Sequence, residues 1–163
     1  MFKKDDVVIN KKGQVCKIID VTKINGGAGD RNYYVLISCF SNSTDKSYIP
    51  CENESMLRKP IDKDEIEKIL GKIKDIKPIW YVNPKIRKTE FKEMYDTGDP
   101  IKIFTLIKSF EAKKAELINE KKTLSFTDES FLKEIKRNLY NEFAVSLGKT
   151  PEEVEMLIRS YLN

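Results

Sequence analysis

Hydrophobic residues alternate with polar ones, or form short β-branched runs, from the start of the chain to Arg58. This period of two predicts strands over 7–9, 15–21, 33–40 and 47–50, with Pro50 ending the last one. Loops are expected at 25–30, which is rich in glycine, and at 41–45, which is polar. Short strands joined by such turns are typical of a small, strongly bent barrel of the SH3 or Tudor type.

After Pro60 the apolar residues recur at helical spacing, and about five helices are expected. Four starts are marked by residues that favour the first positions of a helix: Asp62 or Asp64, Asp99, Ser125 and Thr150. A basic helix is expected to begin near Lys85. The chain is therefore predicted to be an α+β protein of two domains. Residues 1–59 would form the SH3/Tudor-like β barrel, and residues 60–163 an all-α helical domain.

Composition and charge limit the kinds of partner. The chain of 163 residues is 40% hydrophobic and 34% charged, with a formal net charge of +4. Because neither half is a polycation, nucleic-acid binding would need a local basic patch and would be sensitive to salt. There is no apolar run of the roughly 20 residues that cross a bilayer, and no apolar signal near Met1. A cytoplasmic protein without membrane contact is expected.

The residue inventory does not favour catalysis. The chain has no histidine, which is the commonest general base and a frequent metal ligand. Its glycine-rich loop leads into a strand and not into a helix, so it lacks the geometry of a phosphate loop. We expect no enzymatic activity, no metal, no cofactor and no small-molecule substrate; an unrecognised active site is the alternative. The three cysteines are interpreted as reduced structural thiols, with a redox role as the alternative.

The first candidate surface surrounds Trp80, the only tryptophan. It is followed by Lys85, Arg87 and Lys88 at the expected start of a basic helix. An exposed indole beside cations could enter a DNA base step while the cations hold phosphates. The alternative is that Trp80 packs a junction between helices or domains, as a lone tryptophan usually does.

Two other surfaces have weaker signals. Tyr48 and Ile49 lie on a short strand that either presents an edge to a partner strand or completes the barrel. Further lysines and an arginine could form a basic face across two helices, but interspersed glutamates favour an ordinary solvated surface. These basic residues are Lys113, Lys114, Lys121, Lys122, Lys133, Lys136 and Arg137.

Several short motifs, taken in order, resemble the CarD/CdnL family of bacterial transcription regulators. The opening 2–8 resembles "FKxGDxVV", and 13–18 resembles "HGVGxI". The segments 33–36, 48–50 and 57–58 resemble "YYVL", "xVP" and "LR". Thr97-Gly98-Asp99 stands in place of "SGD". The segments 124–129 and 142–144 resemble "LSxxE" and "ELA". The resemblance covers nearly the whole chain in order, and its β part also resembles the polymerase-interacting module of the transcription-repair coupling factor.

The resemblance implies a function. The Tudor-like domain would bind the β subunit of RNA polymerase, partly by strand pairing, through Lys23, Lys46, Ser47, Tyr48, Ile49 and Pro50. The helical domain would contact promoter DNA upstream of the melted bubble, largely independently of sequence, and modulate the stability of the open complex. The DNA-binding residues would be Trp80, Lys85, Arg87 and Lys88, with the tryptophan as a minor-groove wedge.

One departure leaves the DNA contact open. Counted back from Gly98, the family's tryptophan position falls on Pro84 and not on Trp80. Either Trp80 acts as the wedge from a shifted loop, or this chain has no wedge. The alternative function is therefore a protein–protein adaptor, built on a Tudor-like module, that binds polymerase or another protein without touching DNA.

Overall fold

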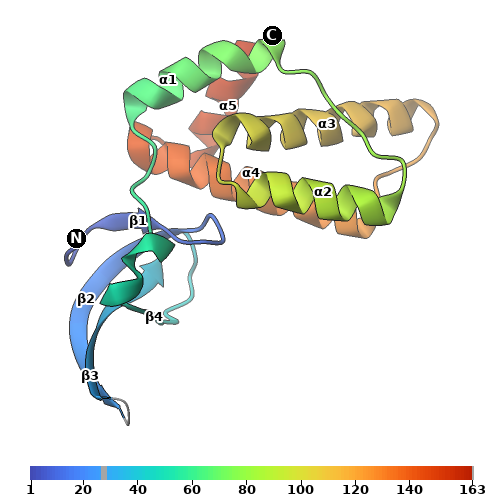
Figure 1. The fold of residues 1–163 in the computed structure, drawn as a ribbon. Coiled ribbons are helices and arrows are strands. Elements are labelled where there is room, and N and C mark those ends of the chain that lie inside the picture. Colours follow the sequence, from blue (N-terminus) through green and yellow to red (C-terminus); the bar gives the residue numbers. More distant parts are fainter. Residues whose placement is uncertain (27–28, 163) are drawn as a thin grey trace. The chain divides into compact units, whose positions relative to one another are not determined.

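The computed structural model describes residues 1–26 and 29–162, and its contacts divide the chain into two compact units. Met1–Ile61 forms the sheet unit, and Asp62–Asn163 forms the helical unit. The division falls two residues after the boundary expected from the sequence. A four-stranded antiparallel sheet precedes five α-helices (Figure 1), so the α+β class is confirmed. No described helix is long and apolar enough to cross a membrane.

The sheet unit contains β1 (Val7–Ile9), β2 (Val15–Gly26), β3 (Gly29–Ser38) and β4 (Ser47–Pro50), paired in that order. The predicted loop at 25–30 is wrong in part, because Asn25 pairs with Asp30 and Gly26 with Gly29. Gly27 and Ala28 of that loop lie outside the described residues. Side chains at this end of the hairpin are exposed on both faces. Because neither face packs against a core, the residues do not need the alternation of apolar and polar side chains that marks a strand.

The expected barrel is not closed in the part of the chain that the structure describes. β4 pairs only with β3, and β1 forms the opposite end of the sheet. A short 3-10 helix, η1 (Cys51–Met56), follows β4 and leads to a single bridge between Ile9 and Arg58. The two N–H to carbonyl distances of that bridge are 2.8 and 3.1 Å. The free edge of β1 is thus met by one residue pair, which is too little to continue the sheet around a barrel.

Buried hydrophobic residues of β1, β2 and β3 form a core in the sheet unit together with Leu57. This buried cluster consists of Val8, Cys16, Ile18, Tyr34, Leu36 and Leu57. The Tyr34 hydroxyl donates to a Glu54 carboxylate oxygen at 3.0 Å and accepts from the backbone N–H of Phe2 at 3.3 Å. Burial is the main cause that raises the pKa of Tyr34, so the phenol remains a donor at neutral pH. This hydroxyl therefore ties η1 and the first residues of the chain to β3.

The helical unit contains α1 (Lys63–Lys72), the 3-10 turn η2 (Ile73–Asp75), α2 (Pro84–Asp96), α3 (Pro100–Asn119), α4 (Phe126–Leu147) and α5 (Pro151–Leu162). The expected caps at Asp62, Asp99, Ser125 and Thr150 are confirmed by side-chain bonds to backbone N–H groups of the first turns. The second helix starts at Pro84 and is capped by Asn83. Gly148 ends α4 in the left-handed conformation that glycine tolerates, with φ of 64°.

Helix α3 packs against α2 and against α4, and α4 also packs against α5 (Figure 1). The segment between η2 and α2 crosses α3. At the centre of these contacts lie Phe91 of α2 and Phe110 of α3, which are 1% and 0% exposed. Their ring centroids are 5.2 Å apart in an edge-to-face arrangement. These phenylalanines pack α2, which carries Lys85, Arg87 and Lys88 of the predicted DNA-binding residues, onto α3.

Candidate functional site

The predicted polymerase-binding residues lie mostly on one edge of the sheet. β4 is the last strand in the sheet order, so one of its edges has no strand partner among the described residues. Lys46, Ser47 and Tyr48 are exposed, and Tyr48 keeps 50% of its surface. Ile49 instead faces inward and packs partly against the buried cluster. The edge thus combines unpaired backbone with an exposed aromatic ring, which are the two features that β-strand addition uses.

Lys23 lies apart from β4 along the sheet. It sits on β2, and its ammonium is 2.8 Å from a carboxylate oxygen of Asp30 on β3. Because both side chains are at least half exposed, this ion pair is weak and does not prevent contact with a partner.

Trp80 is partly buried within the helical unit. Its ring meets Phe91 and Phe110 edge to face, at centroid distances of 5.9 and 5.8 Å. The Arg87 guanidinium lies 4.5 Å from its centroid, and the Lys113 ammonium lies 5.6 Å from it. The indole therefore packs the segment before α2 onto α2 and α3. Inserting it into DNA would require these contacts to open, so the arrangement argues against a free wedge and favours the packing alternative.

Arg87 is also committed to contacts within the unit. Its side chain is 10% exposed, and its Nη2 lies 2.8 Å from Oδ2 of Asp128 on α4. The guanidinium also donates to the backbone carbonyl of Tyr81 at 2.8 Å and to that of Val82 at 3.3 Å. A guanidinium with these partners has little to offer a phosphate. The structure thus separates the predicted DNA residues into a packed pair, Trp80 and Arg87, and two exposed lysines.

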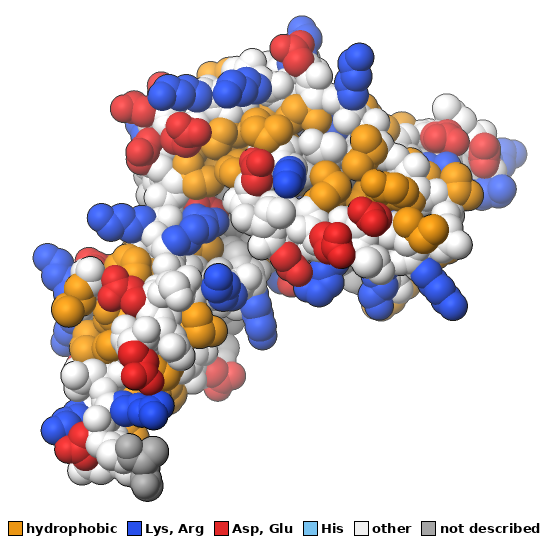
Figure 2. Space-filling view, viewed as in Figure 1, with side chains coloured by type: hydrophobic (Ala, Val, Ile, Leu, Met, Phe, Trp, Pro, Cys, Tyr) orange, Lys and Arg blue, Asp and Glu red, His pale blue; other side chains and the backbone are white. Residues whose placement is uncertain are grey.

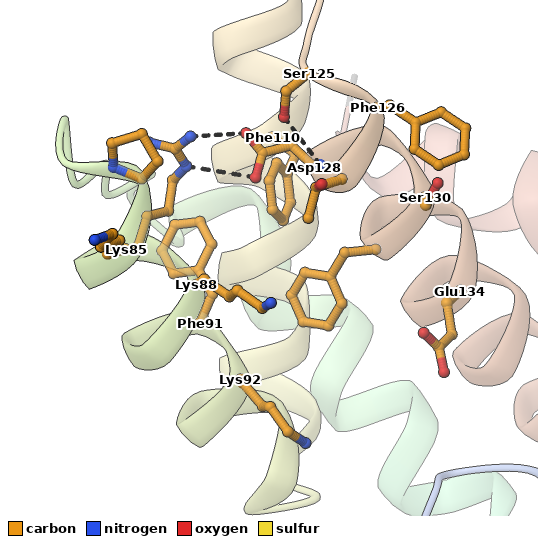
Figure 3. A pocket seen from close by; sticks show the side chains of 14 residues that line it. Lys85, Lys88, Phe91, Lys92, Phe110, Ser125, Phe126, Asp128, Ser130 and Glu134 are labelled. Atoms are coloured by element: carbon orange, nitrogen blue, oxygen red, sulfur yellow. Dashed lines mark hydrogen bonds and ion pairs between the residues drawn. The ribbon is translucent and has the colours of Figure 1, made fainter.

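The exposed lysines border a groove between α2 and α4, with a volume of about 690 Å³ (Figure 3). Lys85, Lys88 and Lys92 stand on the α2 wall. The floor is aromatic, with Phe91, Phe110 and Phe131. The α4 wall carries Ser125, Phe126, Thr127, Asp128, Ser130 and Glu134. In Figure 3 the side chains of Lys88 and Lys92 extend from α2 towards α4.

Three residues of this groove were missed by the sequence reasoning. Lys92 follows Lys85 and Lys88 at the spacing that keeps side chains on one helix face, so this signal was present in the sequence. Phe126 is 88% exposed and Phe131 is only partly buried. No sequence signal distinguishes them from the fully buried phenylalanines, because exposure depends on which helices pack nearby.

Elsewhere on the helical unit, apolar side chains are exposed where the segment before α2 crosses α3 (Figure 2). Ile79 and Val82 of this segment are 38% and 87% exposed.

Carboxylates partly neutralise the other predicted basic face. Ion pairs of 3.0–3.3 Å join Lys113 to Glu116, Lys114 to Glu129 and Lys136 to Glu111. This supports the interpretation of that face as a mixed solvated surface.

The cysteines carry free thiols in the sheet unit, with Cys16 buried and Cys39 exposed. Burial is the main cause that raises the pKa of Cys16, to about 11, so its thiol stays protonated at neutral pH. Burial also raises the pKa of Cys39 and Cys51. Among the described residues, no group of three or more Cys, Asp or Glu side chains could hold a metal ion.

Two surfaces therefore have the features of a binding site: the free edge of β4 in the sheet unit and the groove between α2 and α4 in the helical unit. Both expose aromatic rings beside lysines. No protein-family model matches this chain, and no curated protein is significantly similar to it.

Proposed function

We propose that this protein is a transcription regulator, similar to the CarD/CdnL family, that binds the β subunit of RNA polymerase through the edge strand β4. The observation that carries the proposal is the unpartnered edge of this strand together with the exposed Tyr48. Strand addition at such an edge supplies backbone hydrogen bonds, and Tyr48 adds a side chain for specificity. The proposal implies a cytoplasmic protein with no substrate of its own.

The connection after β4 supports the SH3/Tudor-like part of the proposal. A 3-10 turn follows the fourth strand, and the chain then bridges back to β1 at Ile9 and Arg58. This path brings the chain from β4 to the opposite edge of the sheet, as the path of a small, partly open barrel does. It leaves β4 as the edge on which a partner strand can add, and we regard the sheet unit as a separate domain on this basis.

Polymerase binding can be tested with purified bacterial RNA polymerase and the full chain. We expect a complex with the β subunit, and we expect Tyr48→Glu to weaken it by roughly tenfold or more, since a charge replaces a ring at the contact. Val21→Glu, at a position of β2 with 42% exposure, is the matched control and should bind within about twofold of wild type. Absence of a complex at every salt concentration, or equal binding by both variants, would refute the proposal.

For the helical unit the family resemblance implies a contact with promoter DNA. Because Trp80 and Arg87 have internal partners, this contact would rest on the exposed Lys85 and Lys88. Binding to polymerase would raise the effective concentration of DNA, so two phosphate contacts would be useful there although they are weak alone.

The second candidate for the helical unit is an adaptor that binds protein and not DNA. The specific observation that favours it is the aromatic floor of the groove beneath the lysines, since a phosphate backbone has no apolar group to cover it. The lifetime of the open polymerase–promoter complex discriminates between the two. With DNA contact, the chain should lengthen or shorten this lifetime, and Lys85→Ala with Lys88→Ala should abolish most of the effect. As an adaptor, the chain should leave the lifetime unchanged.

A further inference from the structure

The α2 wall of the groove carries a row of positive charge. Lys85, Lys88 and Lys92 are exposed and recur at i, i+3 and i+7, which places them along one face of the helix. Seven residues of helix span about 10 Å at 1.5 Å per residue, so the row covers two turns. One of these charges is partly compensated, because Lys92 lies 3.1 Å from Asp96 in an exposed ion pair.

Other charges of the groove leave the row largely unbalanced. Arg87 and Asp128 face each other at 2.8 Å and compensate each other. Glu134 is the remaining carboxylate of the lining, and it stands on α4. Figure 3 shows it well away from Lys85, near the level of Lys92. The groove therefore offers a negative ligand a positive wall along α2, and a largely polar, uncharged one beside the start of α4.

The floor of the groove is aromatic, and Phe126 adds one apolar ring to the polar side chains of the α4 wall. Phe91 and Phe110 form the buried base of the floor, and Phe131 is the floor residue that remains partly exposed. Phe126, the first residue of α4, is 88% exposed and lines the same groove. A partner that covers exposed aromatic surface of this kind gains binding free energy, because aromatic residues dominate the energetics of protein contacts.

We infer that this groove binds an acidic, amphipathic helix of a protein partner. Apolar side chains at i, i+3, i+4 and i+7 of that helix would lie on Phe131 and against Phe126, and its carboxylates would face Lys85, Lys88 and Lys92. Charge complementarity selects an acidic ligand over a basic one, and the aromatic floor selects an amphipathic peptide over DNA. This inference rests on the adaptor role of the helical unit and goes beyond polymerase binding, since the groove and β4 belong to different units.

A fluorescent helical peptide tests the inference with the full chain and without polymerase. The probe has about 18 residues, with leucines at positions i, i+3, i+4 and i+7 of each helical repeat and glutamates elsewhere. We expect saturable binding that weakens as salt is raised. Changing Lys85, Lys88 and Lys92 together to glutamate should reduce the affinity by roughly tenfold or more, because attraction becomes repulsion. Phe126→Ala should reduce it severalfold by removing an exposed anchor.

Matched variants and probes make these effects specific. Changing the exposed Lys63, Lys68 and Lys149 to glutamate alters the net charge equally and should leave the affinity within about twofold. Met156→Ala removes an exposed apolar side chain of α5, 71% exposed, and should also be silent. Two control peptides should bind much more weakly: one with lysines in place of glutamates, and one with alanines in place of leucines.

Several outcomes would overturn the inference. One is that the acidic peptide does not bind at any accessible concentration, and another is that the basic peptide binds equally well. A third is that the two triple lysine-to-glutamate variants lose the same affinity for the acidic peptide. Displacement of the peptide by short duplex DNA at lower concentration than by unlabelled peptide would assign the groove to DNA. None of these results bears on the binding of polymerase by β4, so the two proposals can fail independently.

Discussion

Replacing Phe110 by alanine should lower the free energy of unfolding of the helical unit by about 4 kcal/mol, within the range for a buried phenylalanine. Phe110 is fully buried, and its ring meets Trp80, Phe91 and Phe131 edge to face at 5.2–5.9 Å. Its removal leaves a cavity among rings that come from α2, α4 and the segment before α2. These rigid rings cannot all move inward to fill the cavity, so little of the loss should be recovered by relaxation.

Urea denaturation checks this expectation, with the fluorescence of Trp80 as the probe. Because Trp80 is the only tryptophan and belongs to the helical unit, its signal reports the unfolding of that unit, and far-UV circular dichroism provides a second measure. Phe126→Ala is the control. It removes the same side chain from a position that is 88% exposed, and should change the free energy of unfolding by less than about 0.5 kcal/mol. Similar losses in the two variants would contradict the packing described here.

The second large effect is expected at the ion pair between Arg87 and Asp128. Arg87→Met should destabilise the helical unit by about 3 kcal/mol, because it leaves the Asp128 carboxylate, only 15% exposed, without its cation. The same substitution removes the donor to the carbonyls of Tyr81 and Val82. It also removes the guanidinium that lies against Trp80.

A double-mutant cycle separates the pair from these other contacts. Changing Asp128 to leucine alongside Arg87→Met should cost less than the sum of the two single changes, since no buried charge is left alone. The matched control is Lys92→Met, which breaks the exposed pair with Asp96 on the same helix and should cost no more than about 0.5 kcal/mol. Strict additivity in the cycle, or an equal loss in Lys92→Met, would show that the buried pair contributes no special coupling.

These two expectations bear on function because the same residues shape the groove. Phe110 forms its floor, and Arg87 with Asp128 joins its two walls. A variant that loosens either contact should also lower the affinity for the acidic peptide, because the lysines change position while their charge stays the same. Comparing the peptide affinity of Arg87→Met with its stability therefore shows how far the groove depends on a rigid frame.

Much of the fold could be predicted because its signals are local. The alternation of apolar residues placed most strands, and the caps at Asp62, Asp99, Ser125 and Thr150 placed helix starts, since a cap depends on residues within one turn. The exposed polar residues at 25–30 resemble a loop, although Asn25 pairs with Asp30 and Gly26 with Gly29 as strand. The sequence predicts a barrel, but the described strands form an open sheet. Strand patterns carry no information on how many hydrogen bonds form between distant edges.

The candidate site depended more strongly on tertiary structure. The sequence by itself determined that Trp80 lies beside a basic helix and that the lysines share a face. Only the packing decided that Trp80 and Arg87 turn inward, because their partners Phe110 and Asp128 come from α3 and α4, many residues away in the chain. The same packing left Lys85, Lys88 and Lys92 on the rim of an aromatic groove. A groove forms where two helices rest on a third without filling the space between them, and no pattern within a single helix records that arrangement.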